Sequence, residues 1–447
     1  MSDTQRQIKL PAVPKAKQGR EAALKWEWTE ASVWNERMLA TLERGIKGGK
    51  WFSLIDKVYK MENLHSAAVK VAKGKSLKKR DGRKCRRYLE QSQWRLPPLQ
   101  DELKNGEYQP RPVQRVWIAK LGSKEKRPLG VPIVEDRVVQ MAVRNVIEPI
   151  FEHTFAEHSY GFRPGRGAKD ALRRVQGLLD AEKIWVVDAD IKGYFDNIPQ
   201  DKLLAAVGQH ISDGKVMELL QRMLEQGVME SGKGWSPTEN GTPQGAVISP
   251  LLANIYLNPL DHLMASEGRE MVRYADDFVI LCASREEAEA ALDTVRRWTE
   301  AMGLTLHPAK TRIVDATQKG GFDFLGYHFE RGYRWPRQKS LGKFRDAIRQ
   351  KTARKRSDSM SDIITDINQT LRGWFAYFKH SHKTTFAPLE SWTRQRLRSI
   401  LRKRHKGSGR ARGRDHQRWP NAYFAELGLI SLTIARAKAS RPNAKSH

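Results

Sequence analysis

Cysteine is almost absent from this chain, which has only Cys85 and Cys282 among its 447 residues. Two thiols cannot build a disulfide framework or a cysteine-rich zinc site, so both of these classes are excluded. We therefore expect a protein of a reducing compartment, in which the two cysteines are buried or incidental thiols.

Long hydrophobic runs are missing as well. The first thirty residues hold charges and prolines but no apolar segment of signal-peptide length. The long uncharged run from Asn240 to Leu260 is broken by prolines and asparagines, which is untypical of a membrane-spanning helix. We expect a soluble protein of the cytoplasm that has no membrane partner.

Acidic residues are few beside the basic ones. The chain has 51 Asp and Glu against 80 Lys and Arg, which gives a formal net charge of +29 and a pI of about 10.1. Such an excess is tolerated when a polyanion neutralises it. Nucleic acid is the expected partner, because the cations are spread along the whole chain, whereas a membrane anchor would add a concentrated apolar face.

An acid pair stands between two apolar β-forming segments in the stretch Met271 to Ala283, which reads MVRYADDFVILCA. The pattern predicts strand, tight turn and strand, with Asp276 and Asp277 at the tip. Adjacent carboxylates at a hairpin tip can share hard cations. A solvated turn is the ordinary alternative, since Asp is a common turn residue.

A second strand that ends in acidic residues favours the cation site over the solvated turn. Residues 184–191 form a near-continuous apolar run, which is typical of a strand covered on both faces, and they include Asp188 and Asp190 on one face. An acid from this strand beside the Asp276–Asp277 tip would complete a cluster of three carboxylates. Such a cluster can hold two Mg²⁺ ions, about 3.5 to 4 Å apart, for in-line phosphoryl transfer. The sequence therefore points to polymerase chemistry.

Cation-rich segments elsewhere have more than one interpretation. The loop from Lys120 to Pro132 can wrap a triphosphate, contact a nucleic-acid backbone or form an ordinary basic hairpin. The Lys-rich run from Lys70 to Arg87 is either a solvated surface or a loop that follows phosphates. After the loop that ends at Pro132, the apolar residues from Val138 to Ile147 have helical spacing, and Pro149 is expected to mark the end of this helix.

The C-terminal part is predicted to be helical and basic. Residues 363–378 carry a helical apolar stripe, which we interpret as the packing face of an α-helical thumb. Residues 394–418 are rich in Arg, Lys and His. Clustered arginines with scattered glycines suit irregular folded RNA, which proteins read through phosphate, 2′-hydroxyl and base stacking.

Six ordered blocks of this sequence resemble the group II intron reverse transcriptases, which are also called maturases. The likeness runs from about Trp34 to about Leu432. Its blocks are KRPLGVP with SYGFRPGRG, DADIKGYFDNI, GTPQGAVISPLLANIYL, YADD, GLTLHPAKT and FLGYHF.

The resemblance implies an α/β (α+β) right-hand polymerase with fingers, palm and helical thumb, and with basic N- and C-terminal regions. The expected divisions are a basic arm at 1–28, an N-terminal extension of the fingers at 29–90, fingers and palm at 91–330, the thumb or maturase domain at 331–393, and a basic region that binds RNA or DNA at 394–447. The expected activity is RNA-directed DNA synthesis together with assistance to intron splicing and mobility.

The resemblance also implies the roles of individual residues. Asp190, Asp276 and Asp277 would be catalytic and would hold two Mg²⁺ ions, with Mn²⁺ as a substitute, while Asp188 and Asp196 would be neighbours. Phe195 would be the steric gate that leaves no room for a 2′-hydroxyl. The nucleotide-binding set would be Lys124, Lys126, Arg127, Phe195, Gln244, Gly245 and Lys310.

For nucleic acid, the FLG segment matches the primer grip, which comprises Phe324, Leu325 and Gly326. The residues expected to bind RNA are Arg349, Arg354, Arg356, Arg372, Arg402 and Arg404. The expected partners are group II intron RNA, an RNA template with a DNA primer, dNTPs and target DNA.

The sequence departs from the family in two places. GKSLKKRDGRK stands where many relatives have a glycine-rich block, which leaves the N-terminal contacts of the fingers undefined, and no paired CxxC motif follows the tail, so we expect no endonuclease domain. Two alternatives stay open: a maturase that only binds RNA and assists splicing, and a reverse transcriptase domesticated by its host, for example in phage defence.

Overall fold

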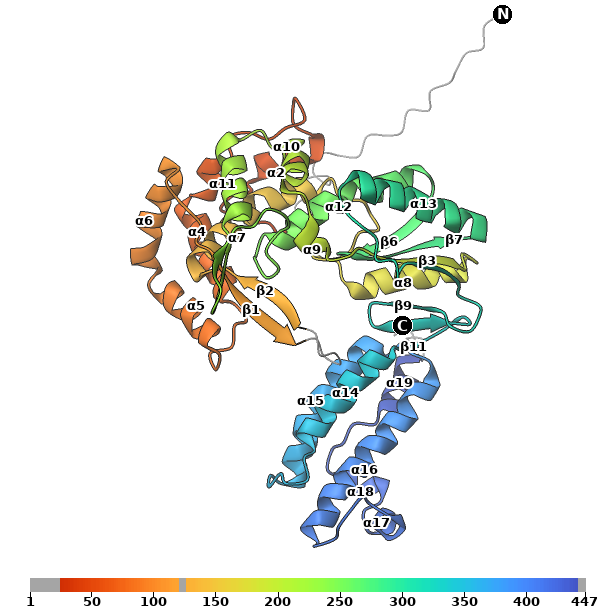
Figure 1. Ribbon diagram of the computed structural model, residues 1–447. Coiled ribbons are helices and arrows are strands. Elements are labelled where there is room, and N and C mark those ends of the chain that lie inside the picture. Colours follow the sequence, from red (N-terminus) through yellow and green to blue (C-terminus); the bar gives the residue numbers. More distant parts are fainter. Residues whose placement is uncertain (1–24, 120–125, 441–447) are drawn as a thin grey trace, which may run out of the picture.

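The computed structural model describes residues 25–119 and 126–440. Three groups of elements succeed one another along the chain: an N-terminal helical group with a small sheet, a central sheet flanked by helices, and a set of long C-terminal helices (Figure 1). Within the described residues, no helix is both long enough and apolar enough to cross a membrane.

The N-terminal group is built around one long buried helix, α7. This helix continues past Pro149 to Glu152, so the expected end at Pro149 is wrong. Proline has no N–H for the carbonyl four residues earlier, and the indole of Trp34 donates to that Asn145 carbonyl instead, at 3.1 Å. The elements of the group are α2 (Glu36–Arg44), α3 (Ile55–Val58), α4 (Met61–Ala72), α5 (Arg80–Glu90), α6 (Ser92–Asn105), β1 (Val113–Ala119), β2 (Lys126–Val131) and α7 (Val134–Glu152).

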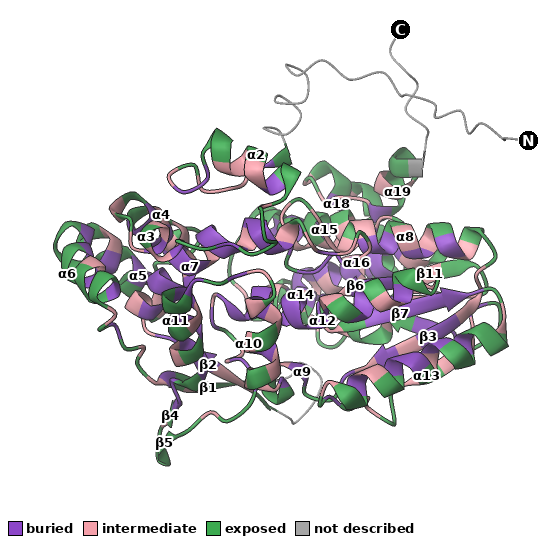
Figure 2. Ribbon diagram, turned by 90° about the horizontal axis from the view of Figure 1, so that it is seen from above, coloured by how far each residue is buried: buried purple, intermediate pink, exposed green. Residues whose placement is uncertain are grey.

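The central sheet has the strand order β6-β7-β3-β8 and is antiparallel throughout. Figure 2 shows β3 and β7 largely buried between helices on the two sides of the sheet. The expectation of a strand covered on both faces at 184–191 is confirmed. The elements here are α8 (Ala168–Asp180), β3 (Trp185–Asp190), α9 (Tyr194–Asn197), α10 (Gln200–Gly208), α11 (Gly214–Glu225), α12 (Ser249–Ser266), β6 (Glu270–Tyr274), β7 (Asp277–Cys282), α13 (Arg285–Ala301) and β8 (Arg312–Asp315).

Successive side chains of the central strands point to opposite faces of the sheet and pack into two different hydrophobic cores. Val187 and Ala189 of β3 pack into the core that includes α13, whereas Val186 belongs to the core that includes α8. Since side chains two residues apart share a face, Asp188 and Asp190 lie on the α8 face. Val279 of β7 is on that same face, and so is Asp277. The sequence pattern therefore places these acids at one end of one face.

Two smaller sheets complete the strands. In the first sheet β1 pairs antiparallel with β2 and parallel with β4, and in the second β9, β10 and β11 form an antiparallel meander. The second sheet joins the central sheet to the C-terminal helices, because β9 contacts β3 and β7, and Tyr327 of β10 contacts Phe378 of α15 with ring centroids 5.0 Å apart. The strands are β4 (Val228–Glu230), β5 (Gly234–Ser236), β9 (Phe322–Phe324), β10 (Tyr327–Glu330) and β11 (Tyr333–Pro336).

The C-terminal helices share one hydrophobic core. The apolar stripe predicted at 363–378 forms its centre, with Ile363, Ile364 and Ile367 fully buried. Helix α16 runs across the expected boundary at residue 393 and contributes Leu397 and Ile400 to the same core. The elements are α14 (Gln338–Lys351), α15 (Met360–Phe378), η1 (Lys383–Thr385), α16 (Phe386–Arg404), α17 (Gly413–Arg418), α18 (Asn421–Glu426) and α19 (Leu432–Ser440).

Candidate active site

Two acids that are 87 positions apart in the sequence face each other in the central sheet. Asp190 ends β3, Asp277 begins β7, and the antiparallel register pairs them directly. Directly opposed residues in an antiparallel pair have side chains on the same face, with Cβ atoms about 4.5–5.5 Å apart. Asp276 precedes Asp277 in the β6–β7 turn. The structure thus brings Asp190, Asp276 and Asp277 together where β3 ends and β7 begins.

The turn that carries Asp276 is held in an unusual backbone conformation. Ala275 has a φ of 61°, a region that L-residues rarely occupy. The segment around Gly161 packs tightly against this turn, because a Cβ at Gly161 would lie 2.2 Å from the backbone nitrogen of Ala275. Only glycine allows this approach, which explains one glycine of the SYGFRPGRG block.

A buried arginine supports the turn from beneath. Arg273 is 0% exposed, and its guanidinium donates to Asp261 on α12 at 2.7 Å, to the Asn254 side chain at 2.9 Å and to the Ala275 carbonyl at 2.9 Å. Burial alone would lower the pKa of Arg273, but the Asp261 carboxylate raises it. The guanidinium therefore stays charged and ties the β6–β7 turn to α12. Sequence reasoning missed this role, although the RYADD string placed the arginine next to the acids.

The acids repel one another in a partly desolvated setting. The surrounding protein, together with the negative charges of Asp276, Asp188 and Asp190, raises the pKa of Asp277 to about 7, although its carboxylate still touches solvent. Burial also raises the pKa of Asp276, and Asp190 adds to the shift. The negative charge of these carboxylates is thus only partly balanced by nearby cations of the protein, which favours the binding of added cations.

One cationic side chain of the protein forms an ion pair with these acids. The ammonium group of Lys310, from the HPAKT segment before β8, forms an ion pair with Asp190. Arg312 similarly donates to Asp188 at 3.3 Å. Among the residues that the structure describes, no three His, Cys, Asp or Glu side chains are gathered closely enough to hold a metal ion as they stand. The donor set itself fits Mg²⁺, which prefers carboxylate oxygens, once Lys310 leaves Asp190.

The expected nucleotide contacts are divided between the β1–β2 hairpin and two loops. Lys124 lies outside the described residues. Lys126 and Arg127 begin β2 and are exposed. The Arg127 charge lowers the pKa of Asp276, although burial has the larger, opposite effect. The side-chain amide of Gln244 donates to the Asp196 carboxylate at 3.2 Å. The backbone carbonyl of Gln244 accepts from the backbone N–H of Gly130 at 2.8 Å.

Glycines shape the floor beside the expected steric gate. Phe195 lies on the short helix α9, half-buried, with its ring 5.5 Å from that of Tyr194. A Cβ at Gly241 would lie 2.5 Å from the Phe195 carbonyl, so the Gln244 loop needs glycine there to pack against α9. Gly245, with a φ of 108°, lets the same loop turn toward Gly130. Phe195, Gln244 and Gly245 are therefore parts of one packed unit.

The FLG segment forms the turn between β9 and β10 and is bound by the C-terminal helices. Phe324 is fully buried, whereas Leu325 and Gly326 form the turn itself, with φ values of 47° and 86°. The Tyr377 hydroxyl donates to the Leu325 carbonyl at 2.7 Å, and the backbone N–H of Arg337 donates to the Gly326 carbonyl at 2.9 Å. Sequence reasoning missed Tyr377, which carried no signal beyond the aromatic WFAYF string.

The six arginines expected to bind RNA fall into two sets. Arg349, Arg356, Arg402 and Arg404 are engaged within the protein; Arg356, for example, donates to Asp366 at 2.8 Å and Arg402 to Asp415 at 2.8 Å. Arg354 and Arg372 are exposed and make no hydrogen bond or ion pair within residues 25–119 and 126–440. Only the second set is free to meet RNA without breaking a contact.

Two protein families match the chain. The family of reverse transcriptases (RNA-dependent DNA polymerases) matches residues 118–329, and the maturase-specific domain of group II introns matches residues 341–419. The first match contains all the expected acids and nucleotide contacts. The second begins three residues into α14 and ends at Trp419, just after α17.

Two curated relatives are similar to part of the chain. The group II intron-encoded protein LtrA of Lactococcus lactis subsp. cremoris is 42% identical over 170 residues, which cover 38% of this chain and 28% of LtrA. The protein YkfC of Escherichia coli K12 is 36% identical over 275 residues, which cover 53% of this chain and 71% of YkfC. The chain thus spans about a quarter of the length of LtrA.

Among solved structures, a telomerase from Candida albicans in complex with a fragment of telomeric RNA covers 73% of this chain and 66% of its own, at 12% identity and a TM-score of 0.43. That likeness is too remote to support a functional argument. The two matched domains and the YkfC relationship are sufficient by themselves: the chain belongs to the group II intron reverse transcriptase family, with a polymerase domain followed by a maturase-specific domain.

Proposed function

We propose that this protein is an RNA-directed DNA polymerase encoded by a group II intron, which copies intron RNA into cDNA and, as a maturase, assists splicing and mobility. The observation that carries the proposal is the direct opposition of Asp190 and Asp277 beside Asp276. Helices α2 to α7 with the β1–β2 hairpin would be the fingers, the central sheet the palm and α14 to α19 the thumb with its RNA-binding extension.

Asp190, Asp276 and Asp277 would hold two Mg²⁺ ions, and Mn²⁺ would substitute for them. When bound, such ions activate the attacking oxygen and stabilise the leaving oxygen of a phosphoryl transfer. Reverse transcription requires this chemistry at the 3′ end of a DNA primer. The raised pKa of Asp277 supports the assignment, because a carboxylate crowded by other acids gains most from a bound cation.

The remaining side chains would bind and orient the substrates. Lys126 and Arg127 would hold the triphosphate of the incoming dNTP, and Lys310 would exchange Asp190 for the pyrophosphate oxygens. Phe195 would exclude ribonucleotides, and Gln244 with Gly245 would form the surface beneath the nucleotide. The turn at Leu325 and Gly326 would position the primer. Arg354 and Arg372 are the first candidates for contacts with intron RNA, because they have no hydrogen-bond or ion-pair partner among the described residues.

The experiment that tests the proposal uses the full chain with the flanking intron transcript, a DNA primer, dNTPs and Mg²⁺, and scores cDNA and spliced exons in one reaction. Both products are expected. Spliced exons without cDNA would support a splicing-only maturase instead, and cDNA without splicing would favour a reverse transcriptase adapted to another role. Asp276→Asn is the matched control, which should remove cDNA and leave splicing.

A further inference from the structure

Asp196 lies directly after the expected steric gate and contacts the side chain of Gln244. The side-chain amide of Gln244 donates a hydrogen bond to the Asp196 carboxylate at 3.2 Å. An ionised carboxylate has only acceptor sites, whereas an amide has a donor end and an acceptor end. The contact therefore has one possible sense: the NH₂ group of Gln244 faces Asp196, and the carbonyl oxygen of the same side chain points away from it.

The backbone around this contact is held on two sides. The Thr242 N–H donates to the Phe195 carbonyl at 2.7 Å, which joins the loop to α9. The backbone carbonyl of Gln244 accepts from the Gly130 N–H at 2.8 Å, which joins the loop to β2. Only the torsions of the Gln244 side chain stay free. Among the described residues, Asp196 is the one group to which that side chain is hydrogen-bonded, so Asp196 sets its direction.

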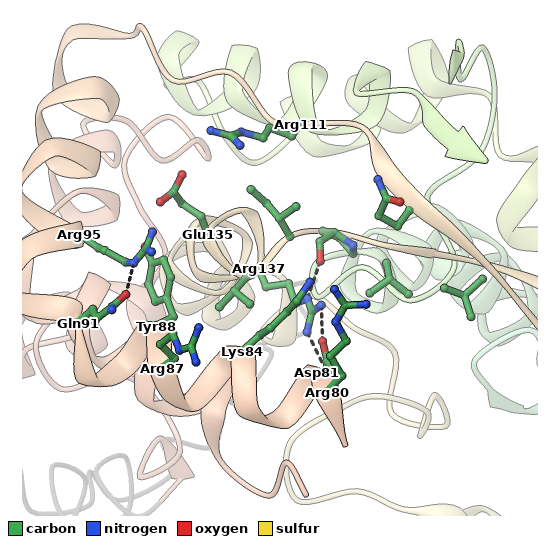
Figure 3. A pocket seen from close by; sticks show the side chains of 16 residues that line it. Arg80, Asp81, Lys84, Arg87, Tyr88, Gln91, Arg95, Arg111, Glu135 and Arg137 are labelled. Carbon is green, nitrogen blue, oxygen red and sulfur yellow. Dashed lines mark hydrogen bonds and ion pairs between the residues drawn. The ribbon is translucent and has the colours of Figure 1, made fainter. Parts of the chain in front are cut away.

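Arg115 of β1 lies on the same side of the strand as this contact. Gln114 and Val116 line a cleft of about 860 Å³ against α5 (Figure 3). Arg115, between them, lines a separate pocket of about 290 Å³ together with Asp196 and Gln244. Successive residues of a strand point to opposite faces. Arg115 therefore points away from α5 and into the pocket that Asp196 borders.

The charge of Arg115 favours the ionised form of Asp196. The surrounding protein raises the pKa of Asp196, although its side chain still touches solvent, and the Arg115 charge lowers it. A protonated Asp196 would offer a donor to Gln244 and would allow the amide to turn round. Because the guanidinium opposes this protonation, it helps to keep the Gln244 amide in one sense.

The free oxygen of the Gln244 amide is an acceptor, and this decides which groups it can recognise. Under the proposed function, Gln244 lies beneath the incoming nucleotide, next to Phe195. The sugar of a deoxynucleotide carries a single hydroxyl donor, at the 3′ carbon, because the 2′ carbon has none. A sugar without that donor would leave the Gln244 oxygen unpaired, and a polar group left unpaired on binding lowers affinity.

We propose that Asp196 is a positioning residue for nucleotide selection, which turns the Gln244 carbonyl oxygen toward the 3′-hydroxyl of the incoming dNTP and so favours sugars that have a donor at the 3′ carbon. The inference rests on the proposed function, from which it takes the position of the nucleotide. It adds a second requirement on the sugar: Phe195 excludes a hydroxyl at the 2′ carbon, and the pair of Asp196 and Gln244 selects one at the 3′ carbon.

The test measures single-nucleotide extension of a DNA primer on an RNA template. The two substrates are dTTP and its 3′-fluoro analogue, in which fluorine replaces the 3′-hydroxyl and has no proton to donate. The wild type is expected to prefer dTTP. Asp196→Asn should lower the ratio of kcat/KM for dTTP to that for the analogue about fivefold, because asparagine can present a donor of its own to the Gln244 oxygen.

Two variants control for charge and shape. Asp196→Glu keeps a carboxylate that only accepts, so it should retain most of the wild-type ratio, whereas the asparagine variant, which has nearly the shape of aspartate, should not. Asp201→Asn removes an exposed acid of α10 and should leave the ratio unchanged.

Two further measurements separate positioning from a structural defect. The preference of Asp196→Asn for dNTP over rNTP should equal that of the wild type, since Phe195 governs the 2′ position; a loss of both preferences would show a distorted α9 and count against the inference. In a Gln244→Met background, Asp196→Asn should change the ratio of dTTP to analogue no further, because the side chain through which Asp196 acts is absent.

Equal ratios for Asp196→Asn, the wild type and Asp201→Asn would overturn the inference, and so would a full effect of Asp196→Asn in the Gln244→Met background. Both results leave the proposed function intact, because the wild type extends the primer in the same assay. A wild type that does not extend with dTTP would instead overturn the proposed function, and this inference with it.

Discussion

The Lys310 ammonium and the Asp190 carboxylate form an ion pair at the end of β3, where Asp190 is paired with Asp277 of the neighbouring strand β7. This pair gives the acid cluster an internal counter-ion. Under the proposed function, a divalent cation and Lys310 would therefore compete for the same carboxylate.

The substitution Lys310→Gln removes this competitor. We expect Mn²⁺ to bind several-fold more tightly to the nucleotide-free variant, because Asp190 is then unpaired. The KM for dNTP should rise, because the variant lacks the ammonium group that is proposed to bind the pyrophosphate. Manganese paramagnetic resonance and steady-state kinetics measure the two effects. Lys319→Gln, which removes an exposed lysine elsewhere, should change neither.

The substitution Asp276→Asn tests the acid cluster itself. Primer extension should fall by roughly a thousandfold or more, because an amide cannot replace the carboxylate charge that holds the cations. RNA binding should be nearly unchanged. Asp188→Asn is the matched control, since Asp188 is paired with Arg312 and should matter far less. Extension by Asp276→Asn at the wild-type rate would refute the assignment.

The buried pair of Arg273 and Asp261 should separate stability from activity. Arg273→Met leaves the Asp261 carboxylate buried and unpaired, which should lower the free energy of unfolding by about 3 to 5 kcal/mol. Adding Asp261→Leu should restore much of this loss. Primer extension should stay low in the double variant, because the Ala275 carbonyl still lacks its donor. Thermal unfolding and extension assays measure both quantities, and a fully active double variant would show that Arg273 is not a positioning residue.

Stability should also depend on the protonation of Asp136. This carboxyl is 1% exposed and accepts hydrogen bonds from the Tyr108 hydroxyl and the Arg111 N–H, yet burial raises its pKa to about 6. Because the folded pKa exceeds the unfolded value of about 3.9, the stabilisation is complete at low pH and is lost as the pH rises through 6, by up to about 3 kcal/mol.

The substitution Asp136→Asn should remove this component. Denaturant unfolding at pH 4.5 and 7.5 should therefore show a smaller decline for the variant than for the wild type. Asp101→Asn, at an exposed position on α6, should keep the wild-type decline. An identical decline in all three proteins would contradict the role of Asp136.

Phe195 should govern the choice of sugar. Phe195→Ala should raise the kcat/KM ratio of ribonucleotide to deoxynucleotide by about tenfold or more, because the space for a 2′-hydroxyl opens. Single-nucleotide extension with dNTP and rNTP measures the ratio. Phe52→Ala removes a phenylalanine that is 62% exposed in the N-terminal group and should leave the ratio unchanged.

Strand periodicity and turn chemistry are local properties, so the sequence alone predicted that Asp190 follows a buried strand and that Asp276 and Asp277 lie at a hairpin tip. The meeting of Asp190 with Asp277 was implied by the family resemblance, and the structure pairs the two residues. The continuation of α7 past Pro149 was not predictable, since the Asn145 carbonyl finds its donor in Trp34, more than a hundred positions away. The pairing of Arg356 with Asp366 and of Arg402 with Asp415 was hidden for the same reason. Composition shows that cations are abundant, but only tertiary contacts decide which of them are free.

The junction between palm and thumb is secured by two reciprocal tyrosines. Tyr327 of β10 donates to the Tyr377 carbonyl at 2.7 Å, and Tyr377 of α15 donates to the Leu325 carbonyl at 2.7 Å. Phe378 is packed in the same core as Val279 of β7. These contacts couple α15 to the β9–β10 turn, so under the proposed function a displacement of α15 by bound nucleic acid would also displace the turn that is proposed to position the primer.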